Sequence, residues 1–509
     1  MGHRYWTGIC AAVGLLAVSV GPQPALAADL CVGGPKPGCF ATLQAAIDAA
    51  QDGDTIKLAP GTYAGGITID KSVGLVGKSA GATTIQGGGP VITIGDGTAD
   101  LTVSISRVTI TGGFNDSKPE SQFGSGFFAA GGGVLIQAAA DNTIGATVTI
   151  SDSVISGNRV TAGPPQPICG NPCSFASGGG IANWGTLTVT HTRIDDNVAG
   201  STPTSGGLAT DARGGGIWNS GVGVVMLRRS FVTGNRSAVS AANGRFAEGG
   251  GINDDGTLTI ADSVIDDNAC DASTAVPNTF PLEMQAAVGG GIRITDWPGA
   301  NATITGTTIS NNDAASTNVG GDASANSGGL DVDGSLLLVD SRVDHNTVRT
   351  SVPPSSGNLA SAAFAGIEVQ GAATIRNTSV SGNRAAAVSA TGPAIGAGVG
   401  IANLSGQVTL ERTRVIGNRG SYQGGVGLPF FVGGGINGGG ILNTDFGGGP
   451  PVLTISDSVV TANELTTTTD ITPRGGGIFS ANVFTGDPIP FTLTRTVIAG
   501  NKPDQCVGC

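Results

Sequence analysis

The stretch GGGIANWGTLTVTHTRIDDN occupies positions 178–197, and GGGINDDGTLTIADSVIDDN occupies positions 249–268. Each stretch begins with three glycines and an isoleucine, continues with an alternating segment, and ends with isoleucine three positions before asparagine. The final asparagine recurs at intervals of 33 to 45 residues. Its positions are Asn158, Asn197, Asn235, Asn268, Asn312, Asn346, Asn383, Asn418, Asn463 and Asn501. A repeat of this length is typical of a solenoid or a propeller.

Each repeat contains three short apolar segments separated by turn residues. In the first copy they are Ile181, then Leu187 with Val189, then Ile194. Alternation places Leu187 and Val189 on one face, while the intervening threonines point the other way. Three short strands cannot form a propeller blade, which needs four, but they can form one coil of a parallel β-helix. A buried column of asparagines would then bond from coil to coil and to turn backbone.

Composition supports a core with many tight turns and excludes several classes of protein. Glycine supplies 87 of 509 positions, charged residues only 12%, and hydrophobic residues 39%. There is no Gly-X-Y period for collagen, and this hydrophobic content is not that of a disordered chain. The net charge is −12 with a pI near 4.6, so the basic footprint of a nucleic-acid binder is missing.

The N-terminal segment has the features of a secretory signal peptide. A basic start is followed by a short apolar run over 9–20 and by Ala25-Leu26-Ala27, so we expect residues 1–27 to be removed. Residues 28–54 are expected to form an N-terminal cap with a helix over 42–50, and 55–509 the solenoid. No later apolar stretch is long enough to span a membrane. We therefore expect a secreted, extracellular protein, with association with the cell envelope as an open alternative.

The cysteines fit an oxidising compartment. Seven remain after export, and close spacing suggests three disulfides with Cys270 left over. The expected pairs are Cys31–Cys39, Cys169–Cys173 and Cys506–Cys509. The Cys-x-x-Cys spacing at the C-terminus is also compatible with zinc, but no histidine lies near it, so we expect a disulfide and no metal.

The string FATLQAAIDAAQDGDTIKLAPGTY at positions 40–63 resembles the entry motif of bacterial right-handed parallel β-helix proteins of the pectin-lyase-like superfold. The repeats are similar to those of the polymorphic outer membrane protein family, although the phenylalanine of that family's Phe-x-x-Asn is usually Ile or Val here. The resemblance implies an all-β, single-stranded right-handed parallel β-helix, a solenoid of about 13 coils at ~4.8 Å each, with a short N-terminal capping helix. Because the superfold hosts lyases, hydrolases, epimerases and adhesins, the resemblance leaves function open.

Candidate catalytic residues are few. Asp196 and Asp267 belong to Asp-Asp pairs such as those of glycoside hydrolases, and Arg193 lies beside the first pair. Both pairs occupy the two positions before the column asparagine, where other repeats carry Ser-Gly or Thr-Gly. Turn chemistry therefore competes with catalysis as the explanation for these residues.

A binding function rests on the segments between each asparagine and the next glycine run. These segments vary in length, and insertions at one corner of a solenoid often form a binding surface. Trp184 and Trp218 occupy nearby positions in consecutive coils and are a candidate sugar-stacking platform, or simply a cover for a sheet edge. We therefore predict a secreted protein of the binding or adhesion type that contacts a polysaccharide or a surface protein. The alternatives are a polysaccharide lyase, glycoside hydrolase or epimerase, and a structural envelope spacer. No cofactor is expected, with calcium relevant only to an enzyme.

Overall fold

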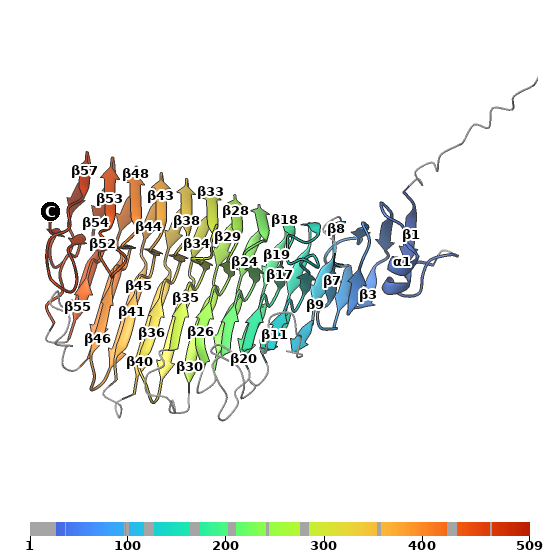
Figure 1. The fold of residues 1–509 in the computed structure, drawn as a ribbon, viewed down its shortest axis with the longest axis horizontal. Helices are drawn as coiled ribbons and strands as arrows, with labels where there is room; N and C mark the ends of the chain where they lie inside the picture. The colour runs from blue at the N-terminus through green and yellow to red at the C-terminus, as the bar shows by residue number, and fades with distance from the viewer. Residues whose placement is uncertain are drawn as a thin grey trace, which may run out of the picture.

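The chain winds into a rod of stacked coils built from five parallel sheets (Figure 1). The computed structural model describes residues 27–509 except 36, 96, 98–100, 117–126, 163–173, 202–209, 241–243, 275–284, 354–357, 425–434 and 469–470. We name the sheets A to E. Sheet A runs from β1 (Asp29–Val32) to β57 (Thr492–Thr494), and sheet B from β3 (Gly61–Ala64) to β58 (Val497–Ala499). Sheet C runs from β4 (Ile67–Ile69) to β59 (Cys506–Val507). Sheet D runs from β10 (Phe114–Asp116) to β55 (Glu464–Thr467), and sheet E from β11 (Phe127–Ala130) to β51 (Ile436–Asn437). Sheet A has 14 strands, sheets B and C have 13 each, D has 10 and E has 9. The predicted parallel β-helix is confirmed.

One coil visits the sheets in the order C, A, B, D and E. The coil that contains the first quoted repeat consists of β17 (Ile181–Asn183), β18 (Thr186–Thr190), β19 (Arg193–Asp195), β20 (Val198–Ser201) and β21 (Thr210–Arg213). The sequence predicted the first three of these strands only. Because the fourth and fifth strands of each coil are short and rich in Ala, Ser and Gly, they lack the Ile and Val signal of the first three.

Sheets D and E form a second, thinner layer on one side of the rod. Sheets A, B and C enclose the main core of Ile, Leu and Val, which runs from Val32 to Ile478. Sheets D and E enclose a separate core dominated by alanine, exemplified by Ala199, Ala212 and Ala325. In Figure 1 the D and E strands extend from the lower edge of the rod. The predicted one-sided insertions are therefore partly sheet, while the tips of several of them lie outside the described residues.

The triple glycine is the corner at which the chain passes from sheet E into sheet C. Gly249 adopts φ +55°, a left-handed conformation that a side chain disfavours. At Gly250 a Cβ atom would lie 2.4 Å from the carbonyl oxygen of Gly290 in the next coil. Close backbone stacking at this corner therefore requires glycine.

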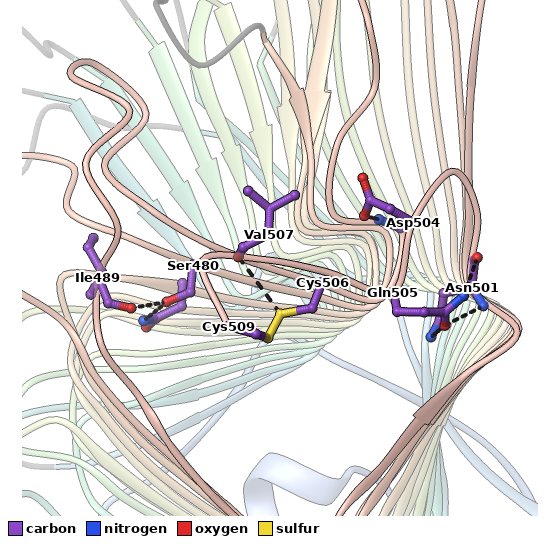
Figure 2. Close-up of a disulfide and its surroundings, with 10 residues drawn as sticks. Ser480, Ile489, Asn501, Asp504, Gln505, Cys506, Val507 and Cys509 are labelled. Atoms are coloured by element: carbon purple, nitrogen blue, oxygen red, sulfur yellow. Dashed lines mark hydrogen bonds between the residues drawn. A yellow bond between two sulfur atoms is a disulfide. The ribbon is translucent and has the colours of Figure 1, made fainter.

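The repeat asparagines form one continuous hydrogen-bonded row at the corner between sheets B and D. Asn197 donates from Nδ2 to Oδ1 of Asn235 at 3.0 Å, and the backbone N–H of Asn197 donates to the same oxygen at 3.1 Å. The row runs to Asn501, whose Nδ2 donates to Oε1 of Gln505 at 3.0 Å (Figure 2). Each member is almost fully buried, so the row satisfies polar groups that would otherwise be costly in the interior.

The two ends of the rod differ. Helix α1 (Leu43–Ala49) lies at the N-terminal end, where Leu43, Ala46 and Ile47 join the main core. At the other end, β59 pairs with β56 (Ile478–Ser480). No helix among the described residues has the length and apolar character needed to cross a membrane.

Of the expected disulfides, Cys31–Cys39 is confirmed and joins the ends of a short loop after β1, with Cα atoms 4.7 Å apart. Cys506 and Cys509 also form a disulfide in this structure (Figure 2). Cys169 and Cys173 lie outside the described residues. Cys270 is a free, buried thiol within sheet D, and its burial raises its pKa.

Candidate functional site

The three residues that the sequence offered for catalysis lie on or beside sheet B. Asp196 and Asp267 are exposed turn residues with φ +54° and φ +55°, and they follow β19 and β29 (Val264–Asp266), which are two strands apart in sheet B. Arg193 forms an ion pair with Asp195 at 2.8 Å. Within the described part of the chain, no hydrogen bond or ion pair joins Arg193, Asp196 and Asp267. Their positions fit the turn explanation.

The two tryptophans do meet, but not as an open stacking platform. The rings of Trp184 and Trp218 pack edge to face with centroids 4.6 Å apart, and Phe128 contacts both. Trp218 is only 7% exposed. Trp184 is half-buried and, together with Phe128, lines a cavity of about 420 Å³. Only Trp184 is therefore available to a ligand.

Polar and charged side chains occupy one face of sheet C over four consecutive coils. The second residue of each sheet C strand points away from the main core. It is Asn253 in β27 (Ile252–Asp254), Arg293 in β32 (Ile292–Ile294), Asp331 in β37 (Leu330–Val332) and Glu368 in β42 (Ile367–Val369). Asp255 and Asp333 follow β27 and β37 on the same side. Sheet E covers this face, because Glu248 of β26 (Gly244–Glu248) contacts Arg293.

Two arginines connect these side chains into one cluster. Arg293 pairs with Glu248 at 2.7 Å and with Asp333 at 3.3 Å. Arg213 of β21 pairs with Glu248 at 3.1 Å and with Asp211 at 3.3 Å. We call the following residues the acid–arginine cluster: Asp211, Arg213, Glu248, Asp255, Arg293, Asp331, Asp333 and Glu368.

Asp255 is held by donors from three coils. It accepts hydrogen bonds from Trp218 Nε1 at 3.0 Å, from Asn253 Nδ2 at 3.0 Å and from Thr295 Oγ1 at 3.0 Å. Burial raises the pKa of Asp255, while Arg213 and these donors favour its ionised form. Trp218 therefore orients a carboxylate rather than presenting its ring to solvent.

Asp331 and Glu368 both contact the hydroxyl group of Ser327. Ser327 Oγ lies 2.9 Å from Asp331 Oδ2 and 2.6 Å from Glu368 Oε2. A hydroxyl has one proton, so it can donate to one carboxylate only, and the other carboxyl must be protonated to donate in return. Desolvation accordingly raises the pKa of both groups.

Asp333 is the member best suited to give up a proton. Its side chain is 14% exposed, whereas Asp331 and Glu368 are buried. Desolvation, followed by the nearby Asp331 charge, raises the pKa of Asp333 to about 7. A carboxyl group with this pKa retains a proton near neutral pH and remains within reach of solvent.

Several polar atoms in and around the cluster have no partner among the described residues. They include Asn253 Oδ1, Asp331 Oδ1 and Asp333 Oδ1. Buried oxygens without hydrogen bonds are costly and mark positions where a ligand or water supplies the missing partner. The described residues contain no group of three metal-ligating side chains suited to a metal ion.

A second polar row ends beneath this face, inside the main core. Asn183 Nδ2 donates to Asn219 Oδ1 at 2.8 Å, and Asn219 Nδ2 donates to Asp254 Oδ1 at 2.7 Å. The next residue in this column is Ile294, which is apolar. Burial raises the pKa of Asp254 to about 7, and its Oδ2 has no partner among the described residues.

Sequence reasoning missed this site although a signal was present. The informative position is the one that follows the Ile or Leu after each glycine run. It holds Ala182 and Trp218 in earlier coils and a charged residue in three later ones, which are Arg293, Asp331 and Glu368. A departure from the repeat confined to consecutive coils indicates a local site.

Comparison with known proteins identifies similar folds but no family. No protein-family model matches the chain, and no curated protein matches it. Among solved structures, the GH87 α-1,3-glucanase catalytic unit from Streptomyces thermodiastaticus strain HF3-3 has 14% identity and a TM-score of 0.41, over 96% of this chain and 72% of that chain. A pectin methylesterase from Erwinia chrysanthemi has 14% identity and a TM-score of 0.28, over 57% and 80%. The mannuronan C-5 epimerase A-module from Azotobacter vinelandii has 12% identity and a TM-score of 0.25, over 92% and 93%. The expected similarity to the polymorphic outer membrane proteins stays a prediction.

Proposed function

We propose that this protein is a glycoside hydrolase that cleaves a polysaccharide at the acid–arginine cluster. The observation that carries this proposal is the pair formed by Asp333, a partly exposed carboxyl whose pKa is raised to about 7, and Asp255, a carboxylate held by three donors. Glycoside hydrolysis requires one carboxyl group that gives a proton and one that stays ionised.

In this mechanism Asp333 protonates the glycosidic oxygen as the bond from that oxygen to the anomeric carbon breaks. Asp255 takes a proton from the water that attacks the anomeric carbon. Thr295 lies between the two in strand register, so they are two strands apart, or ~10 Å along the rod. This spacing is closer to the ~6.5–9.5 Å of inverting enzymes than to the ~5 Å of retaining enzymes.

The lyase and epimerase alternatives would need a Lys, Arg or His side chain that acts as the base at this position. Among the described residues of the cluster, Arg293 pairs with Glu248, whose charge raises the pKa of Arg293, so it stays protonated. His191 and His345 lie in turns with φ +47° and φ +58°, beside sheet B rather than on the outer face of sheet C. The binding hypothesis concerns insertion tips outside the described residues and stays a prediction.

The test is hydrolysis by the purified chain of a panel of polysaccharides, followed by the release of reducing ends and by the ultraviolet absorbance of unsaturated ends. Asp333→Asn and Asp255→Asn are expected to lower the rate by ~10²–10⁴-fold. The control is Asp196→Asn, an exposed turn residue that tolerates the change. Thermal unfolding verifies that each variant is folded. Unsaturated products, or full activity in Asp333→Asn, would overturn the proposal.

A further inference from the structure

We infer that the polymer accepted at the acid–arginine cluster is a neutral polysaccharide rather than a polyuronate, and that it lies across the indole of Trp297. This inference rests on the proposed hydrolase and specifies its substrate class. Two features support it: the charge balance of the cluster and an exposed aromatic ring on the turn that carries Thr295.

The cluster has no cation left over for a substrate carboxylate. Its carboxyl groups are Asp211, Glu248, Asp255, Asp331, Asp333 and Glu368, and its only cations are Arg213 and Arg293. Both arginines are already paired with two of these carboxyl groups each. A uronate would therefore meet like charge at close range, and such contacts discriminate strongly against a ligand.

The surrounding chain does not compensate for this excess. The net charge of the chain is −12. Proteins that bind polyanions place cations along the track of the polymer. Here the approach is also acidic, because Asp296 lies close enough to Asp333 to contribute to its raised pKa.

Trp297 supplies an apolar surface at the edge of this site. It is 60% exposed, and its backbone N–H lies 3.4 Å from Thr295 Oγ1, the hydroxyl that bonds Asp255. Gly221 makes room for the indole, since a Cβ atom there would lie 2.2 Å from Trp297 Nε1. An exposed ring on the turn that carries Thr295 suits the apolar C–H face of a sugar.

The experiment compares matched polymers and matched aromatic residues. For any polysaccharide that the enzyme cleaves, oxidation of its C6 hydroxyls to carboxylates gives a uronate with the same linkages. We expect the oxidised polymer to be cleaved at least about tenfold more slowly, and added salt to reduce that difference by screening. Trp297→Ala should raise KM about tenfold with kcat little changed, while Trp297→Phe retains the contact. Gly221→Ala should act like Trp297→Ala, and Phe231→Ala, an exposed ring on sheet B, is the control.

The outcomes separate this inference from the proposed function. Equal or faster cleavage of natural or oxidised uronates would overturn the inference and leave the hydrolase intact. An unchanged KM in Trp297→Ala would also overturn it. If no polymer is cleaved, the hydrolase proposal fails, and pull-down with the same polymers tests the surface directly. Binding of a neutral polymer that is lost in Trp297→Ala would then support a surface for neutral polysaccharides at Trp297. Absence of such binding would overturn the inference.

Discussion

The outer face of sheet C has two kinds of coil. In β27, β32, β37 and β42 it carries Asn253, Arg293, Asp331 and Glu368, whereas the equivalent position is Leu442 in β52 (Ile441–Thr444) and Phe479 in β56. Both kinds have the same backbone, the same glycine corner and the same asparagine row. The apolar coils join small hydrophobic clusters with sheet E, while the charged coils bury carboxyl groups that cost free energy to desolvate.

This difference shows that the charged coils are not required by the fold. A buried ion pair is often no more stabilising than a well-packed apolar group of similar size. Neighbouring coils form the same sheet without a buried ion pair at this position. The charged face therefore lowers the stability of the fold, and a function explains why it is present. The following changes test the contrast between charged and apolar coils.

The largest effect is expected from Arg293→Met. This change removes the cation that pairs with the buried Glu248 and the partly exposed Asp333, which should cost about 3–5 kcal/mol in the free energy of unfolding. Urea unfolding at neutral pH measures the loss. Arg419→Met, in a largely exposed ion pair with Glu464, is the control and should cost less than about 1 kcal/mol. Equal losses in the two variants would contradict the contrast.

Asp254→Asn should change how stability depends on pH. The pKa of Asp254 is raised from 3.8 to about 7 in the folded chain, so the folded state keeps its proton while the unfolded state loses it. Its contribution is fully present below about pH 4 and is lost as the pH rises to about 7, at a cost of up to ~4 kcal/mol. The variant should therefore be more stable than the parent at pH 8 and similar at pH 4. Unfolding curves at both values would contradict this if the parent were the more stable at pH 8.

Ala182→Ser should disturb an apolar coil. Ala182 is fully buried, and its neighbours in register, Leu135 and Trp218, present apolar surface to it. An unpaired buried hydroxyl should cost about 1–3 kcal/mol. Ala372→Ser, at an exposed position of sheet A, is the control and should be neutral when thermal unfolding is measured.

The smallest effect is expected from Asp267→Asn. Asp267 is an exposed turn residue at φ +55°, a conformation that asparagine adopts readily. Stability should change by less than about 0.5 kcal/mol, and hydrolysis should be unaffected. A large loss of activity would restore this aspartate as a catalytic candidate.

The sequence predicts the fold well because each coil repeats the same pattern of residues. The isoleucines, glycine corners and asparagines stack on their equivalents, so each copy reinforces the reading of the others. Sheets D and E were not predicted because Ala, Ser and Gly form strands there through packing against one another, without strong intrinsic preference. The candidate site was missed because its residues are exceptions to the repeat. Asp255 and Asp333 are 78 residues apart in the sequence, and only the number of strands between them brings them to one face.

The asparagine row gives the rod a polarity comparable to the two unlike ends of a filament. Each bond between two asparagines of the row runs from the side-chain amide to the Oδ1 of the next coil toward the C-terminus, so the first asparagine needs a donor from outside the row and the last needs an acceptor. The backbone N–H of Gly113 supplies the donor to Asn158, and Oε1 of Gln505 supplies the acceptor to Asn501. Whole coils that carry the asparagine are therefore compatible with insertion anywhere between these residues. The two end pieces are not interchangeable, so the length of such a rod is adjustable while its direction is fixed.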